Sequence, residues 1–174
     1  MDKIKKRRKK TGSVLIALLA LVTYFHILKL SSKPGETSSQ QSESLSALII
    51  GFFEKILKTD FDLTGNQFLQ FEGFIRKAAH FTEYALLGFL VYSLFLLWGR
   101  SDVKAAVRSF LLVVGLASFD EFLQIFIPER FAMVKDVIID SIGCLAGMLM
   151  IRLIYFIYVS RKAKADVSQE KLPL

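Results

Sequence analysis

The 174-residue sequence contains a single cysteine, Cys144, so it has neither an internal disulfide nor a metal site built from several cysteines. It also has no internal repeat, no Gly-rich phosphate loop and no H-E-x-x-H motif, which are the best-marked signs of repeat, nucleotide-binding and zinc-hydrolase proteins. Neither Ser118 nor Ser141 lies in a motif typical of a serine nucleophile. Carboxylates and His80 are able to ligate a divalent cation, but without a compact motif we expect no metal and no cofactor.

The composition is strongly apolar and also basic. Hydrophobic residues make up 53% of the chain, 16 residues are Phe, and the mean hydropathy is +0.44. A soluble domain of this size must keep much of its surface polar. The net charge of +7 must therefore be segregated along the chain, and seven of the 23 basic residues do lie between positions 3 and 10. Basic residues directly before an apolar run indicate a membrane anchor and not a nucleic-acid-binding face, so we expect no nucleic-acid partner.

Four apolar segments approach the length of about 20 residues that crosses a bilayer. They cover residues 13–30, 78–98, 105–127 and 134–159. A cleaved signal peptide is an alternative interpretation of the first segment, but no A-x-A cleavage motif follows it, and we favour an uncleaved anchor. The last three segments carry acidic residues within their bounds, whereas the first carries only Lys29 close to its end. This contrast predicts one plain anchor followed by three helices that carry the function.

The distribution of Lys and Arg predicts the orientation. With the N-terminus inside, the inner flanks hold 14 basic residues and the outer portions hold seven. We therefore expect a multi-pass protein of the plasma membrane with both termini in the cytoplasm. One domain of this length is predicted to be all-α, a polytopic membrane protein with four transmembrane helices plus a short amphipathic extracytoplasmic helix.

The predicted organisation has five parts. A basic cytoplasmic N-terminus (1–12) precedes the anchor (13–30), an extracytoplasmic loop (31–75), a three-helix membrane core (76–159) and a cytoplasmic tail (160–174). Within the loop, residues 31–44 are polar and turn-rich, and we expect them to be mobile. Residues 45–58 have apolar side chains at helical spacing and are too short to span, which predicts an amphipathic helix on the outer interface. Residues 65–76 are expected to lead helically into the second span.

Three clusters of polar residues are predicted to lie at similar depth in different spans. Arg76, His80 and Glu83 share one helical stripe, and Asp120 shares a face with Gln124. A third stripe carries Asp136, Asp140, Gly143 and Gly147, and its two glycines form a small-xxx-small pattern that allows close helix packing. The candidate binding residues are Arg76, Lys77, His80, Glu83, Tyr84, Asp120, Glu121, Gln124, Arg130, Asp136 and Asp140.

The depth of the acidic residues predicts that these clusters meet. Asp120 lies seven residues before the predicted outer end of its helix, about 10 Å into the membrane at ~1.5 Å per residue. An unpaired charge there costs roughly 2.5–3.5 kcal/mol. We therefore expect a buried network joining the last three spans and opening to the exterior. A purely structural role for the network is the alternative, although buried ion pairs are often no more stabilising than apolar packing.

The same clusters resemble the VanZ-like family of small bacterial membrane proteins. The resemblance extends over residues 70–155 and rests on an ordered set of residues: Arg76, Lys77, His80, Phe81, Glu83, Tyr84, Leu87, Gly88, Asp120, Glu121, Gln124, Pro128, Arg130, Asp136, Val137, Gly143 and Gly147. Two positions depart from the family pattern. Glu129 stands where the family usually has Gly in a Pro-Gly-Arg turn, and Asp140 stands where Asn is common, so the geometry of the turn and the local charge differ here.

This resemblance implies a role in the bacterial cell envelope, in resistance to teicoplanin-type glycopeptide antibiotics. The expected partners are membrane lipids and either the antibiotic or a lipid-linked cell-wall component, bound in an outward-facing polar cleft. The alternative is an intramembrane enzyme acting on a lipid-linked substrate, with acid–base residues His80, Glu83, Asp120 and Glu121. A third possibility is a scaffolding protein in which none of the three clusters binds a ligand.

Overall fold

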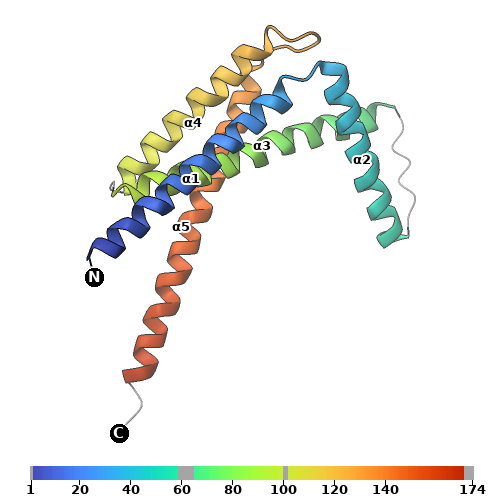
Figure 1. Ribbon diagram of the computed structural model, residues 1–174. Coiled ribbons are helices and arrows are strands. Elements are labelled where there is room, and N and C mark those ends of the chain that lie inside the picture. The colour runs from blue at the N-terminus through green and yellow to red at the C-terminus, as the bar shows by residue number, and fades with distance from the viewer. Residues whose placement is uncertain (1, 59–64, 100–101, 171–174) are drawn as a thin grey trace.

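The computed structural model describes residues 2–58, 65–99 and 102–170, with the side chains of residues 10–58, 65–99 and 102–162. Every regular element in these residues is a helix (Figure 1). The helices are α1 (Asp2–Ser31), α2 (Gly35–Leu57), α3 (Asn66–Leu97), α4 (Asp102–Gln124) and α5 (Val134–Glu170). The all-α prediction is confirmed, and residues 65–76 do lead into the following helix as expected.

Helices α1, α3 and α4 lie side by side, whereas α2 and the second half of α5 project away from them in different directions. In Figure 1, α1 and α4 extend in similar directions over α3, while α5 crosses α3 and then diverges from it. The first turns of α1 lie on the same side of the molecule as the end of α3. The α1–α2 turn and the start of α5 lie on the opposite side, and α2 packs beside the first turns of α3.

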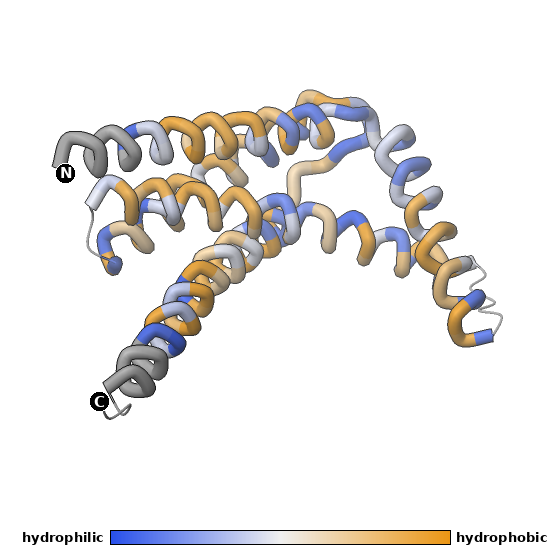
Figure 2. Tube along the Cα trace, turned by 60° about the horizontal axis from the view of Figure 1, so that its bottom comes forward, coloured by the Kyte–Doolittle hydropathy of each residue, from blue (hydrophilic) through white to orange (hydrophobic). Residues whose placement is uncertain are grey.

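Burial in this structure is the inverse of that in a water-soluble protein. Asp120, Glu121 and Asp140 are buried. Large apolar side chains are instead exposed along whole helices, and Leu15, Leu18, Val22, Phe25, Leu111, Ile142, Leu149 and Phe156 are among them. A soluble monomer rarely exposes continuous apolar surface of this extent. Figure 2 shows the same apolar bands on α1 and α4, with hydrophilic residues gathered where α1 meets α2. The molecule is built to face lipid.

Three helices are long and apolar enough to cross a membrane. They are residues 10–31 of α1, the whole of α3, and residues 134–162 of α5. The fourth predicted span, α4, is not among them because charged residues lie in both of its end turns, including Lys104 and Arg108 at one end and Asp120 at the other. The count of four spans therefore stays a prediction.

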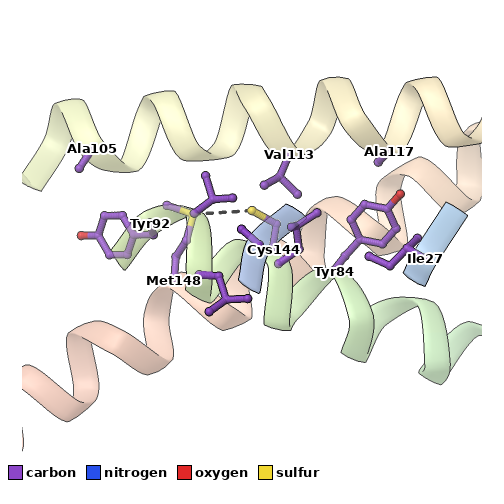
Figure 3. Close-up of a cluster of buried hydrophobic side chains, with 12 residues drawn as sticks. Ile27, Tyr84, Tyr92, Ala105, Val113, Ala117, Cys144 and Met148 are labelled. Carbon is purple, nitrogen blue, oxygen red and sulfur yellow. Dashed lines mark hydrogen bonds between the residues drawn. The ribbon is translucent and has the colours of Figure 1, made fainter. Parts of the chain in front are cut away.

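Three glycines bring the backbones of α3 and α5 together. A Cβ atom on Gly88 would lie 2.6 Å from the carbonyl oxygen of Cys144. A Cβ on Gly143 or Gly147 would overlap the carbonyl oxygens of Phe81 and Ala85 respectively. The small-xxx-small pattern therefore does place its helix face inside the bundle, as predicted. Cys144 is a buried packing residue at this crossing (Figure 3).

The first helix is part of the core and not a plain anchor. Ala20, Ile27 and Ser31 of α1 are buried, and α1 packs along α3. Ile27 lies against the same cluster as Tyr84 of α3, as Figure 3 shows. The segment is apolar enough to span a membrane, as the predicted anchor requires, but the sequence analysis did not predict that one face of this helix packs into the core.

The polar stretch 31–44 is also different from the prediction. It is helical from Gly35 onward, and α2 extends to Leu57. Pro34 stands before the first helical residue, and the buried side chains of Ser42 and Ser46 lie on the face of α2 that packs toward α3. Small serine side chains allow this close packing, while Leu48 and Phe52 remain exposed on the same helix. Tertiary packing has overridden a local preference for turns.

We expect Gly147→Ala to destabilise the fold by roughly 1–3 kcal/mol, because the added methyl group overpacks the α3–α5 contact. Gly115→Ala is the matched control. A Cβ at Gly115 meets no atom within 4 Å, and the residue lies within the exposed part of α4. Thermal unfolding in detergent measures both. Equal midpoints for the two variants would contradict the close α3–α5 packing.

Candidate functional site

Two adjoining cavities lie where the α1–α2 turn, α3 and the α4–α5 loop meet. Their volumes are about 230 Å³ and about 400 Å³. Arg76, His80 and Arg130 line both cavities and so form the wall that they share. The smaller cavity is bordered mainly by α1, α2 and α3, and the larger by α3 and the α4–α5 loop. We call the two together the polar cavity.

Neutral hydrogen-bonding groups surround the cations of the smaller part. It is lined by Ser31, Ser38, Gln41 and Ser42 from the end of α1 and the first half of α2. Glu83 is its single acidic lining residue. A cavity with two guanidinium groups, an imidazole and several hydroxyl groups suits an anion with many acceptor oxygens.

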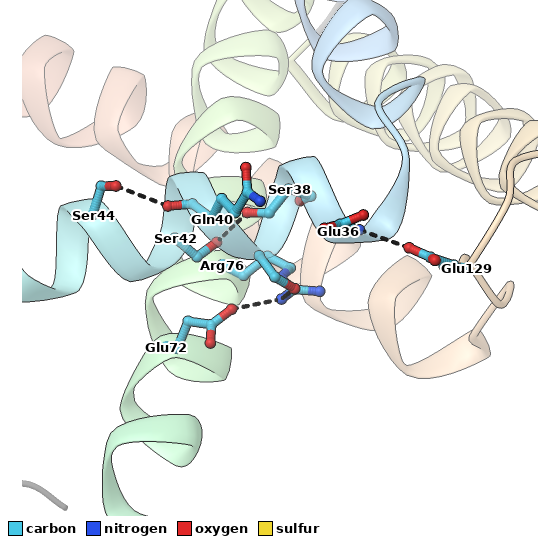
Figure 4. Close-up of polar contacts among 9 residues, drawn as sticks. Glu36, Ser38, Gln40, Ser42, Ser44, Glu72, Arg76 and Glu129 are labelled. Atoms are coloured by element: carbon cyan, nitrogen blue, oxygen red, sulfur yellow. Dashed lines mark hydrogen bonds and ion pairs between the residues drawn. The ribbon is translucent and has the colours of Figure 1, made fainter. Parts of the chain in front are cut away.

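Arg76 is held in place by two neighbours. Its Nη2 donates to Glu72 Oε1 and to Ser39 Oγ, each at 2.9 Å (Figure 4). Glu72 is one turn earlier on α3, and Ser39 belongs to α2. The Arg76 side chain is 34% exposed and the Glu72 side chain 10%, so the ion pair is partly buried. The two contacts therefore orient the guanidinium group and leave its other N–H groups available.

Arg130 reaches the polar cavity from the loop between α4 and α5. Its Nε donates to the carbonyl oxygen of Lys33 at 3.3 Å, which joins this loop to the α1–α2 turn. Burial and the nearby Arg76 guanidinium lower the pKa of Arg130, while Asp120 and Glu121 raise it. Because an arginine pKa starts so far above neutrality, the side chain stays charged. Two like charges held at one cavity wall favour an anionic occupant.

His80 and Asp140 pair across the α3–α5 crossing. His80 Nδ1 lies 3.9 Å from Asp140 Oδ1, and the Asp140 side chain is only 1% exposed. The glycine contact at Gly143 brings α5 close enough to α3 for this pair to form. No described residue donates a hydrogen bond to either Asp140 oxygen. His80 is thus the nearest partner of a carboxyl group that is otherwise enclosed.

The paired acids of α4 lie behind the polar cavity and are already engaged. Asp120 Oδ2 accepts a hydrogen bond from Ser31 Oγ at 2.7 Å and lies 3.5 Å from the hydroxyl of Tyr84. Glu121 Oε2 accepts from the backbone N–H of Met133 at 2.8 Å. Both carboxyl groups therefore fix parts of the fold, Asp120 the end of α1 and Glu121 the start of α5. The helix ends at Gln124, so Asp120 is about 6 Å from its end and not about 10 Å.

The structure divides the predicted site residues into two groups. Seven line the polar cavity: Arg76, Lys77, His80, Glu83, Gln124, Arg130 and Asp136. Four do not line it and are buried behind it: Tyr84, Asp120, Glu121 and Asp140. Charged residues from α3, α4, α5 and the α4–α5 loop therefore gather in one region. The cavity wall carries both the cations and the carboxyl groups of Glu72, Glu83, Glu129 and Asp136, and three further carboxyl groups lie behind it.

Sequence reasoning missed the contribution of α1 and α2. Ser31 and Ser39 bond directly to two of the central residues, and neither was a candidate. A signal was present in α1, where Ala20, Tyr24, Ile27 and Ser31 recur at helical spacing on one face. Tyr24 donates to the carbonyl oxygen of Leu116, so this face joins α1 to α4. The serines of α2 carried no comparable pattern.

Glu129, in the loop between α4 and α5, connects this loop to the start of α2. Its φ is +61°, the left-handed region that glycine adopts most readily. Its side chain accepts a hydrogen bond from the N–H of Glu36 at 3.0 Å (Figure 4). The N–H of Gly35 donates to the carbonyl oxygen of Pro128 at 3.2 Å. The acidic side chain therefore caps the N-terminus of α2, which has no side-chain cap from its own N-cap residue Pro34.

Within the described part of the chain, no group of three or more His, Cys, Asp or Glu side chains is arranged to hold a metal ion. The carboxyl groups are instead distributed among hydroxyl, backbone and imidazole partners.

Comparison with known proteins adds one finding. A model of the family described as VanZ/LLP1 matches residues 15–155. No curated protein and no solved structure matches the chain. The matched region begins in α1, well before residue 70, where the resemblance in the sequence begins. It thus includes the helix that supplies Ser31 to the network.

We expect Ser31→Ala to destabilise the protein by about 1–3 kcal/mol, because it removes the hydrogen bond to the buried Asp120 carboxyl group. Ser32→Ala is the matched control, since Ser32 follows the last residue of α1, is exposed, and its hydroxyl donates to the nearby carbonyl oxygen of Leu28. Thermal unfolding midpoints in detergent provide the comparison. An unchanged midpoint in Ser31→Ala would show that α1 is not bound to α4 through Asp120.

Proposed function

The chain belongs to the VanZ/LLP1 family, and we propose that it is a bacterial plasma-membrane protein that lowers susceptibility to teicoplanin-type glycopeptide antibiotics. It does so by binding an anionic ligand in the polar cavity. The ligand is a phosphate-bearing envelope lipid or the antibiotic itself. The family resemblance supplies the biological setting, and the cavity supplies the chemistry.

The observation that carries this proposal is the pair of guanidinium groups at the wall of the polar cavity. Arg76 and Arg130 line both of its parts and each has only part of its donor capacity used. Arginine presents five N–H donors in a planar fork that fits phosphate and carboxylate oxygens. Nearby serine hydroxyl groups add neutral donors to the same ligand. A basic pocket between membrane helices is a recognised form of lipid head-group site.

The proposed orientation places the polar cavity at the outer face. We take α4 as the fourth span, since its 23 residues have a length of roughly 35 Å, enough to cross the hydrocarbon core. Four spans bring both termini to the cytoplasm, in agreement with the excess of basic residues there. The first turns of α1 and the end of α3 lie together at the end of the molecule away from the polar cavity, which supports this arrangement.

The α2 helix supports a lipid-linked ligand in particular. Its serine face borders the polar cavity, whereas Leu48, Phe52 and Ile56 are exposed on its surface. A helix with this amphipathic character lies at the boundary between head groups and acyl chains. A ligand with a phosphate and an apolar tail then has its phosphate in the polar cavity and its tail along the exposed apolar side chains of α2.

A catalytic role is the second candidate, and the His80–Asp140 pair is the observation that favours it. The His80 imidazole faces the cavity with the buried Asp140 carboxyl group 3.9 Å away, a separation that a bound substrate would have to shorten before the pair acts as a general base or acid. Glu83 lines the same cavity and is the second acid–base candidate. Asp120 and Glu121, the other predicted acid–base residues, do not line the cavity and would only position its walls. Turnover of a lipid-phosphate substrate by purified protein, lost in His80→Gln, would support this candidate over simple binding.

We expect Arg76→Gln and Arg130→Gln each to reduce protection against teicoplanin to near the level of a deletion strain. Each removes a charged donor worth about 1.5–3 kcal/mol to an anionic ligand, or roughly tenfold or more in affinity. Arg108→Gln is the matched control, because Arg108 is an exposed arginine near the other end of α4. Teicoplanin susceptibility of the complemented deletion strain is the measurement.

Protein abundance in the membrane fraction must be equal among these strains, so that lost folding is not mistaken for lost binding. If both cavity variants protect as well as Arg108→Gln at equal abundance, the polar cavity is not the functional site.

A further inference from the structure

A separate cavity of about 760 Å³ lies between the helices at the end away from the polar cavity. Three of the helices that line it, α1, α3 and α5, are those long and apolar enough to span a membrane. Most of its wall is apolar, formed by Ile16, Leu96, Leu97, Ile151 and Tyr155. Nothing in the proposed function uses this space. We call it the wedge cavity.

The wedge cavity arises from the way that α3 and α5 cross. Their backbones touch at Gly88, Gly143 and Gly147, and past this point α5 diverges from α3 (Figure 1). One turn beyond Gly147 the small residues give way to Ile151 and Arg152, which are too large for backbone contact. The position of the last glycine, Gly147, therefore determines where α3 and α5 begin to separate.

The environment and the size of the wedge cavity indicate its occupant. Apolar cavities are poorly suited to water, because water needs several polar partners to remain there. In a bilayer the available apolar material is lipid, and the volume falls in the range of about 300–1,000 Å³ typical of small-molecule sites. An acyl chain entering between α3 and α5 fills a space that the protein leaves open.

The polar residues at the edge of the wedge cavity specify the head group. Asp102, at the start of α4, accepts hydrogen bonds from the Tyr92 hydroxyl and from Arg152. Arg152 is 58% exposed and Asp102 is 44% exposed, so each keeps free hydrogen-bonding capacity toward an approaching group. One cation and one anion side by side give no net charge. They complement a head group that carries a phosphate and an amine.

We propose that the wedge cavity binds a zwitterionic phospholipid. One acyl chain lies between α3 and α5, the phosphate accepts hydrogen bonds from Arg152, and the amine donates to Asp102. The exposed aromatic residues Tyr155 and Tyr158 of α5 extend past the pair, as amphipathic rings do at the level of lipid head groups. The lipid thus fills the space beside the splayed end of α5.

Native mass spectrometry of the full chain in detergent tests the proposal, with phosphatidylethanolamine and phosphatidylglycerol as the probes. Ser93 lines the wedge cavity, and Ser93→Phe places an aromatic ring in the space of the acyl chain. We expect at least tenfold weaker binding of phosphatidylethanolamine to this variant. Ile16→Trp blocks the cavity from α1 and is expected to have the same effect. Leu111→Phe, on the exposed face of α4, is the matched control and should bind as the wild type does.

Two further measurements test which head group is bound. Wild-type protein should bind phosphatidylglycerol at least fivefold more weakly than phosphatidylethanolamine, because Asp102 has no amine to pair with. Arg152→Gln should weaken binding of phosphatidylethanolamine by about tenfold. Equal affinity for the two lipids in wild-type protein would overturn the assignment.

Monodisperse elution and unfolding midpoints keep misfolded variants apart from true loss of binding. If correctly folded Ser93→Phe and Ile16→Trp both bind phosphatidylethanolamine as well as Leu111→Phe does, no lipid occupies the wedge cavity. The proposal is also overturned if wild-type protein is a dimer without lipid and these variants are monomers, since a second copy of the chain then fills the space.

Discussion

The backbone contact between α3 and α5 is the constraint from which the other features of the molecule follow. Gly88, Gly143 and Gly147 allow the two helices to approach until backbone atoms touch. This approach brings His80 of α3 opposite Asp140 of α5. It also buries the side chain of Tyr84, which belongs to α3. The same contact fixes the crossing point of the helices. Beyond it the helices separate, and the wedge cavity opens between them.

The polar network follows from the low dielectric of its surroundings. A carboxyl group that is buried away from water is costly unless it has partners. Asp120 has Ser31 and Tyr84, Glu121 has the backbone of Met133, and Asp140 has His80. Each pairing joins two different segments of the chain. The acids are therefore used to hold the walls of the polar cavity, and the guanidinium groups of Arg76 and Arg130 remain in front of them for a ligand.

Much of this architecture follows from local pattern in the sequence. The periodicity of apolar residues predicts the helices, the stripe from Asp136 to Gly147 predicts which face of α5 is inside, and the depth of Asp120 predicts a network. The contribution of α1 was not predicted. The helical spacing from Ala20 to Ser31 marks one face of α1, but it does not tell whether that face meets lipid or Asp120. The helical start of α2 was missed for a related reason. Its serines favour turns in isolation, and only packing on α3 makes a helix the better choice.

Glu129 shows how a departure from the family pattern is accommodated. A non-glycine residue in the left-handed region costs of the order of 1–2 kcal/mol, so glycine would suit the backbone better at this position. The glutamate side chain, however, bonds to the N-terminus of α2, where a negative charge is favourable by about 0.3–1 kcal/mol in addition to the hydrogen bond itself. These contributions are similar in size and offset the backbone cost. Glycine in the turn would leave α2 without this cap, whereas glutamate connects α2 to the loop that carries Arg130. The serine face of α2 is thereby held beside the guanidinium group of Arg130. Glu129 thus connects α2 and the α4–α5 loop, which form two sides of the polar cavity.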